Sequence, residues 1–272
     1  MGVVNVTPDS FSDGGLYLDR DKAIQHGLLL AEEGAAILDI GGESTRPGSS
    51  GVSAEEELRR VLPVIEGLIA AGTRAAISID TSKASVAAAA LEAGATLVND
   101  VTALRGDPGM ACVIAGAGAD CCLMHMLGEP RTMQENPRYD DVVSDVTAFL
   151  EERLAFAVKH GIGEHRIMLD PGIGFGKTVA HNLELLRRLD EIVALGRPVV
   201  IGTSRKSFLG RLTGRQDTAE RLPGTIATNV LAYERGARVF RVHDVASVVD
   251  ALTIAAATVS RWTETTPTST KT

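Results

Sequence analysis

Short apolar runs recur along the chain, and each one stops at a polar or charged residue or at a glycine-bounded loop. Eight such runs are separated by segments long enough to form helices. A short apolar run bounded in this way is typical of a strand that is buried on both faces. The predicted strands are Gly2–Asn5, Ile37–Gly41, Ile77–Asp80, Leu97–Asp100, Cys122–His125, Ile167–Asp170, Val199–Gly202 and Val239–His243.

Helical spacing of apolar positions fills the intervals between these runs. Ser53 is a predicted N-cap with Glu56 three positions later, and glycines follow the ends of several segments. The predicted helices cover residues 19–35, a segment that opens at Ser53, and residues 83–93, 108–117, 141–160, 179–195, 224–235 and 245–262. Eight strand–helix repeats predict an α/β protein, a single-domain (βα)8 TIM barrel. A doubly wound open sheet is the alternative fold.

Composition narrows the class of protein. The 272 residues suit one barrel of residues 1–262, followed by a C-terminal tail of residues 263–272 that we expect to be disordered. The net charge of −8 argues against a nucleic-acid partner, which a basic face would attract. Three cysteines without metal spacing are expected to be buried thiols. With no apolar stretch of membrane-spanning length and no leader pattern, we expect no membrane association and a cytoplasmic location.

Polar residues gather where the predicted strands end. Because side chains alternate faces along a strand, Arg241 shares a face with His243, and Ser78 with Asp80. If these faces point inward, they line the mouth of the barrel, where barrel enzymes hold their catalytic groups. The alternative is that each residue caps a strand or the following helix. That alternative weakens as the number of polar strand ends grows.

Three loops that follow predicted strands contain candidate lids and candidate anion-binding residues. The segments 5–15 and 41–48 are long and rich in turn formers, as lids over an active site often are. Arg46 in the second segment could bring positive charge to a phosphate. The segment Asp170–Lys177 is rich in glycine, but its spacing does not match a phosphate-binding Walker A loop.

A set of motifs in a fixed order resembles the dihydropteroate synthases. The motifs are Asn-Val-Thr-Pro-Asp-Ser-Phe-Ser-Asp-Gly-Gly at 5–15, Gly-Gly-Glu-Ser-Thr-Arg-Pro-Gly at 41–48, Ser-Ile-Asp-Thr at 78–81, Val-Asn-Asp at 98–100, Leu-Met-His-Met at 123–126, Asp-Pro-Gly-Ile-Gly-Phe-Gly-Lys at 170–177, Ser-Arg-Lys-Ser-Phe at 204–208 and Arg-Val-His-Asp at 241–244. The resemblance implies a TIM barrel that joins a dihydropterin pyrophosphate to p-aminobenzoate, as a homodimer and as a target of sulfonamides.

The resemblance also implies a pterin site. Asp80 and Asp170 would accept hydrogen bonds from ring nitrogens and the amino group, Asn99 would bond the ring edge, and Lys206 would donate to the carbonyl side. The catalytic residues it implies are Asp80, Asp170 and Lys206. The full pterin set is Asp80, Asn99, Val101, Met124, Asp170, Phe175, Gly202, Lys206 and Arg241.

Pyrophosphate and aminobenzoate complete the implied site. The pyrophosphate residues are Asn5, Thr45, Arg46, Arg241 and His243, and the aminobenzoate residues are Arg46, Pro47, Phe175, Lys206 and Ser204. Mg²⁺ is the implied cofactor, with Asn5 as its protein contact. One amide oxygen suits a hard ion that keeps most of its waters, so we expect the metal to bind mainly together with pyrophosphate.

For the reaction, we hypothesise that pyrophosphate leaves before the amine attacks. The resulting pterin-methyl cation would be stabilised by Asp80 and Asp170. Because an arylamine is neutral at physiological pH, His243 is interpreted as a phosphate ligand and not as a general base.

Three other functions remain open from the sequence. A pterin-binding methyltransferase domain would share the fold but would have no pyrophosphate site. A non-catalytic paralogue would bind pterin without turnover, and a barrel enzyme for another phosphorylated substrate follows from the fold alone.

Overall fold

The computed structural model describes residues 1–7, 16–44, 51–128 and 132–259. All strands paired within this part of the chain run parallel to their neighbours. They are β1 Gly2–Asn5, β2 Ile37–Gly41, β3 Ala76–Asp80, β4 Leu97–Asp100, β5 Asp120–Met124, β6 Ile167–Asp170, β7 Val200–Ile201 and β8 Val239–Phe240.

The strands close into a barrel. Strands β1 to β6 form one sheet in sequence order, and β7 pairs with β8. Two isolated parallel bridges join the pieces, Leu169 with Val199 and Gly2 with Val242. At the second bridge the Val3 amide donates to the Val242 carbonyl oxygen at 3.0 Å. The first strand therefore meets the last, which confirms the predicted α/β barrel and excludes the open doubly wound sheet.

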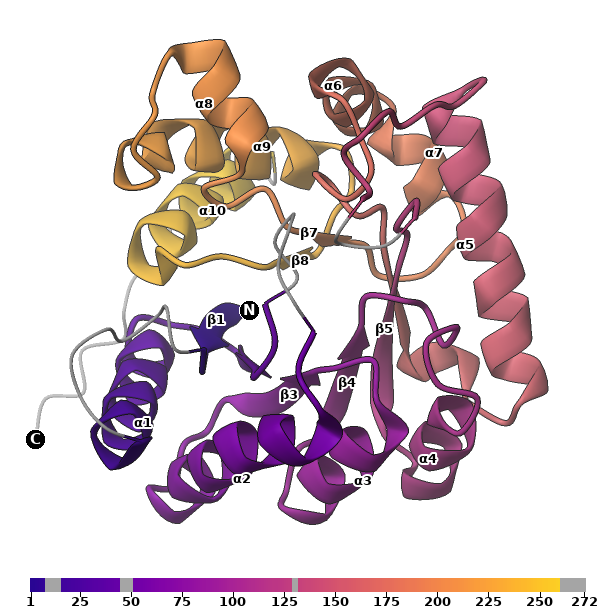
Figure 1. The fold of residues 1–272 in the computed structure, drawn as a ribbon. Coiled ribbons are helices and arrows are strands. Elements are labelled where there is room, and N and C mark those ends of the chain that lie inside the picture. The colour runs from indigo at the N-terminus through magenta and orange to yellow at the C-terminus, as the bar shows by residue number, and fades with distance from the viewer. Residues whose placement is uncertain (8–15, 45–50, 129–131, 260–272) are drawn as a thin grey trace, which may run out of the picture.

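Helices surround the strands on the outside (Figure 1). They are α1 Leu16–Glu32, α2 Ala54–Ala70, α3 Ala84–Glu92, α4 Met110–Ala117, α5 Val142–Lys159, α6 Val179–Arg187, α7 Leu189–Val193, α8 Ser207–Thr213, α9 Leu222–Glu234 and α10 Val245–Val259. The Ser53 N-cap is confirmed, because its side chain accepts from the Glu56 amide at 3.2 Å. The expected tail of residues 263–272 lies outside the described residues.

Strand parity divides the residues of β2 and β3 between two environments. Leu38 stands beside Ile77 in register, and both are fully or almost fully buried in the core cluster that the strands share with the helices. The intervening residues Asp39 and Ser78 also pair in register and hydrogen-bond to each other at 2.6 Å. The polar alternation predicted for Ser78 and Asp80 therefore produces a barrel interior that is polar at this level.

The structure differs from several of the predicted elements. Strands β7 and β8 are shorter than predicted, and β8 ends at Phe240, so Arg241 and His243 follow the strand. The predicted helix of residues 179–195 is two helices, because Arg188 leaves helical geometry with φ −109° and ψ 32°. The guanidinium of Arg188 bonds Asp141 and Glu191 at 2.7 Å each, which holds the break in place. Helix α8 was not predicted. Strand β5 begins two residues earlier than expected and ends at Met124, so His125 follows the strand.

Two of the three cysteines are buried. Cys121 and Cys122 are buried as predicted, and burial raises the pKa of both thiols. Cys112 is exposed, so the prediction was wrong for that residue. In the described ranges, no helix combines the length and apolar character that crossing a membrane requires.

Candidate active site

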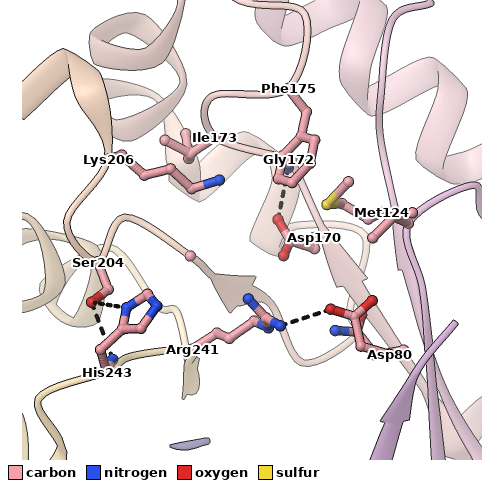
Figure 2. Close-up of a pocket in the computed structure, with 13 residues that line it drawn as sticks. Asp80, Met124, Asp170, Gly172, Ile173, Phe175, Ser204, Lys206, Arg241 and His243 are labelled. Carbon is pink, nitrogen blue, oxygen red and sulfur yellow. Dashed lines mark hydrogen bonds and ion pairs between the residues drawn. The ribbon is translucent and has the colours of Figure 1, made fainter. Parts of the chain in front are cut away.

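A pocket lies at the carboxyl ends of the strands, where the barrel mouth opens (Figure 2). We call it the inner pocket. Its walls come from the ends of β3, β4, β5 and β6 and from the segments that follow β4, β6, β7 and β8. The lining residues are Asp80, Asn99, Val101, Met124, Asp170, Gly172, Ile173, Phe175, Gly202, Ser204, Lys206, Arg241 and His243. All nine residues expected to contact pterin are among them, and the sequence reasoning missed Gly172 and Ile173.

Carboxylate and amide groups form one side of the inner pocket. Asn99 and Asp170 are 5% and 6% exposed, so the pocket holds them almost out of water. Asp170 Oδ1 accepts from the Gly172 amide at 2.7 Å, which leaves Oδ2 for a ligand. Burial raises the pKa of both Asp80 and Asp170, while Arg241 opposes the shift at each. A partner rich in N–H donors is therefore the complement that this surface requires.

Arg241 crosses the pocket toward Asp80, as Figure 2 shows. Its Nη2 donates to Asp80 at 2.7 Å, and its Nε donates to Asp39 at 2.6 Å. Burial opposes its charge, but the two carboxylates raise the pKa of Arg241 above its usual value. The guanidinium is thus fixed by two ion pairs, and within the described ranges Nη1 has no hydrogen bond, so it could meet an anionic ligand.

Asp39 is a site residue that the sequence reasoning missed. Its carboxylate is fully buried inside β2 and accepts from Ser78 at 2.6 Å, from Asn99 Nδ2 at 3.0 Å and from Arg241. It therefore orients Asn99 on one side of the inner pocket and Arg241 on the other. The available signal was an aspartate in the middle of the apolar run Ile37–Gly41, where a charge requires partners.

The remaining wall is basic and aromatic. The Lys206 ammonium lies 4.0 Å from the centre of the Phe175 ring, a cation–π contact. Ser204 Oγ accepts from the His243 amide at 3.1 Å and lies 2.9 Å from His243 Nδ1. These contacts link the loop after β6 to the loop after β7, and the loop after β7 to the segment after β8. Lys206 and Arg241 lie across the pocket from the carboxylates of Asp80 and Asp170 (Figure 2).

The loop after β6 passes so close to the segment after β5 that only glycine fits. At Gly172, where φ is +66°, an added Cβ would lie 1.9 Å from the His125 carbonyl oxygen. At Gly176, where φ is +62°, it would lie 2.6 Å from the Leu127 carbonyl oxygen. Gly172 and Gly176 are therefore required for the close approach of two backbone segments.

Gly172→Ala is expected to lower the free energy of unfolding by about 2–4 kcal/mol, because left-handed strain adds to a backbone clash. Urea denaturation measures the change. The matched control is Gly118→Ala, since Gly118 has φ +60° and no described heavy atom within 4 Å of the added Cβ. It is expected to lose only about 1–2 kcal/mol. Equal losses in the two variants would contradict a contact between the loop and His125.

A larger outer cavity of about 680 Å³ continues from the inner pocket. Asn5, Glu43 and Ser44 line one side of it, and Lys206 and Arg211 line another. Lys83 forms ion pairs with Glu43 and with the buried Glu57, which fixes the start of the segment after β2. Thr45, Arg46 and Pro47, predicted for pyrophosphate and aminobenzoate, lie outside the described residues.

The donor groups around Asn5 fit a metal only in part. Among the described residues, no group of three or more His, Cys, Asp or Glu side chains is arranged to hold a metal ion. Asn5 presents an amide on the same cavity as Arg241 and His243. The set suits a hard cation that arrives with phosphate oxygens and retains water, and it does not form a complete protein cage.

Comparisons with known proteins agree with this arrangement. The family model described as "Pterin binding enzyme" matches residues 1–243. Dihydropteroate synthase of Escherichia coli K12 is 46% identical over 260 residues, which cover 96% of this chain and 91% of that protein. The solved structure of Xanthomonas albilineans dihydropteroate synthase with 4-aminobenzoic acid has a TM-score of 0.90 and 52% identity, covering 96% of this chain and 92% of that one. The same enzyme in complex with 7,8-dihydropteroate has a TM-score of 0.87 and 49% identity, with coverage of 96% and 93%.

Proposed function

This chain belongs to the dihydropteroate synthase family of pterin-binding enzymes, and we propose that it condenses 6-hydroxymethyl-7,8-dihydropterin pyrophosphate with p-aminobenzoate. The products are 7,8-dihydropteroate and pyrophosphate, so the enzyme is a transferase of folate biosynthesis. The observation that carries the proposal is the division of one pocket into an acidic side and a basic side. The first suits a heterocycle rich in N–H groups, and the second suits a pyrophosphate leaving group.

The pterin ring lies on the acidic side. Asp170 Oδ2 and Asp80 accept from the ring N–H and amino groups. Asn99 bonds the same edge, because its Nδ2 already donates to Asp39 and its Oδ1 is left to accept. Val101 and Met124 pack together in a small apolar cluster, against which the flat ring is placed. Buried partners of this kind reject ligands that lack the matching donors.

p-Aminobenzoate binds next to the pterin on the outer side. The Phe175 ring offers an apolar surface, and Lys206 and Ser204 bring positive and polar groups to its edge. The predicted contacts of Arg46 and Pro47 belong to the same subsite and stay predictions. Sulfonamides, whose shape and charge imitate aminobenzoate, are expected to compete there.

Pyrophosphate lies on the basic side, against Arg241 Nη1 and the His243 segment. The first turn of α10, from Val245, begins just beyond, and backbone N–H groups at a helix start favour an anion. Thr45 and Arg46 are further predicted contacts. Mg²⁺, held by Asn5 and the pyrophosphate oxygens, would neutralise the charge of the leaving group.

The geometry supports departure of pyrophosphate before the amine attacks. Two buried carboxylates, Asp80 and Asp170, face the position of the pterin ring, where positive charge develops as the carbon–oxygen bond breaks. The arylamine is neutral and needs no strong base. Because the bound pterin pairs with the polar groups that the pocket leaves open, it displaces the water that would otherwise hydrolyse the cation.

The proposal predicts that pyrophosphate release requires both substrates. A coupled pyrophosphate assay with Mg²⁺ measures the rate with the pterin ester alone, with p-aminobenzoate alone and with both. Release only with both is the expected result, because without the amine the cation recombines with the pyrophosphate that is still bound. A methyltransferase domain or a non-catalytic paralogue would bind pterin without release. A barrel enzyme for another phosphorylated substrate would release none from this ester, and any of these outcomes would overturn the proposal.

Two further properties are proposed with less structural detail. A homodimer is supported by exposed apolar side chains on α9 and α10, since Leu231, Ile254 and Val259 are 46%, 69% and 62% exposed. A cytoplasmic location is supported by the buried thiols of Cys121 and Cys122, which suit a reducing compartment.

A further inference from the structure

Lys177 is a cation that the proposed reaction does not use. It ends the glycine-rich segment after β6, and only 3% of the residue is exposed. Its Nζ lies 2.9 Å from His125 Nδ1, donates to the Phe175 carbonyl oxygen at 3.0 Å and lies 3.5 Å from the His125 carbonyl oxygen. Each of the three ammonium protons therefore faces an acceptor, which is the condition for burying a lysine.

The surroundings keep His125 as an acceptor. Burial, with Lys177 and Arg105 nearby, holds the pKa of His125 far below its usual value, so the ring is neutral. Its edge packs against the Phe149 ring with centroids 4.8 Å apart, which fixes the orientation of the imidazole. Burial also lowers the pKa of Lys177 to about 7, against the raising effect of Asp170. Burying an ammonium group costs free energy, and buried groups with shifted pKa values are frequent at functional sites.

Lys177 binds the residue whose ring forms the aminobenzoate wall. Several groups hold the same loop, among them Gln134, which donates to the Gly174 carbonyl oxygen at 2.6 Å, and Tyr139, which donates to that of Gly176 at 2.8 Å. The Phe175 carbonyl oxygen between them is held by Lys177. The Phe175 ring is half-buried and in turn contacts the Lys206 ammonium at 4.0 Å.

We propose that Lys177 is a positioning residue for p-aminobenzoate, acting through the Phe175 backbone, which it holds against the segment after β5. The inference rests on the proposed function. The Asp170 carboxylate is set separately by the Gly172 amide, and Asp80 and Asn99 come from other strands. Lys177 therefore acts mainly on the aminobenzoate subsite, while the groups that hydrogen-bond the pterin edge keep their own backbone supports.

Lys177→Met tests this role, because methionine has similar length without a donor. We expect the KM for p-aminobenzoate to rise roughly tenfold, the effect of losing one charge-assisted hydrogen bond that positions a binding surface. The KM for the pterin ester should rise much less, because Asp80, Asn99 and Asp170 still hold the ring edge. Lys177→Gln, a shorter side chain that keeps two donors, should give an intermediate KM for p-aminobenzoate and serves if the Met variant does not fold.

The matched control is Tyr139→Phe, which removes the neighbouring tether to Gly176 and leaves the Phe175 carbonyl bonded. It should leave the KM for p-aminobenzoate near the wild-type value. A lysine variant that lowers only the amount of active enzyme, or raises both KM values equally, would overturn the positioning role. So would an equal effect in Tyr139→Phe. If wild type itself released no pyrophosphate, the proposed function would fail and this inference with it, whereas a wild type with normal turnover and unchanged lysine variants would overturn the inference alone.

Discussion

Asp170→Asn is expected to slow pyrophosphate release by about 10²–10³-fold, the usual effect of removing one group that stabilises developing charge. The physical reason is specific to this pocket. The Gly172 amide donates to Oδ1 at 2.7 Å, so an asparagine would keep its oxygen there and turn its NH₂ group toward the ligand. The variant thus replaces an acceptor by a donor against the pterin N–H groups and also removes the negative charge. A rapid-quench single turnover measures the release.

The control for Asp170→Asn is the same change at Asp120. That residue opens β5 at the opposite end of the barrel, its side chain is 47% exposed, and it pairs only weakly with Arg166 at 3.2 Å. Asp120→Asn should release pyrophosphate at the wild-type rate. An Asp170→Asn enzyme that released pyrophosphate as fast as wild type would show that this carboxylate does not stabilise the departing charge.

Arg241→Met is the second change with a large expected effect. It removes the cation that faces Asp39 and Asp80 and the group that meets the leaving pyrophosphate. We expect kcat/KM for the pterin ester to fall about 10²-fold or more. We also expect the free energy of unfolding to fall by about 3 kcal/mol. This is the low end for breaking a buried pair, because the Arg241 side chain is 23% exposed.

Two further variants serve as comparisons for Arg241→Met. Arg241→Lys keeps the charge but cannot bond both carboxylates with a planar fork, so it should recover only part of the activity. Arg238→Met removes an exposed arginine three positions earlier and should match wild type in both steady-state kinetics and urea denaturation. If Arg241→Met had normal kinetics with reduced stability, the residue would be structural and the leaving group would bind elsewhere.

The fold could be predicted from the sequence because the signal repeats. Each strand is an apolar run ended by a polar residue, so an error of two residues at β5 did not change the number or order of strands. The break at Arg188 could not be predicted in this way. It depends on ion pairs with Asp141 and Glu191, and the first of these comes from a distant part of the chain. Local apolar spacing carries no information about such partners.

The site was predictable where it lies at strand ends. Asp80, Asn99 and Asp170 each close an apolar run, and parallel strands bring their carboxyl ends together. Asp39 was not predicted as a site residue because it lies in the middle of its apolar run and not at the end. Its role becomes visible only when the register of β2 with β3 places it beside Ser78, and when β8 closes the barrel and brings Arg241 within 2.6 Å. The role of Lys177 could not be predicted either, because its partner His125 belongs to another loop and meets it only in the folded structure.

A single-turnover experiment tests the central claim most directly. Enzyme in excess is mixed with labelled dihydropterin pyrophosphate, Mg²⁺ and p-aminobenzoate, and both pyrophosphate and dihydropteroate are quantified after rapid quench. The division of the pocket into a pterin side and a pyrophosphate side predicts one dihydropteroate for each pyrophosphate released. When p-aminobenzoate is omitted, the cation recombines with the bound pyrophosphate, and net release is expected to be negligible. Release at an equal rate without the amine, or an ester that binds and stays intact with both substrates present, would contradict it.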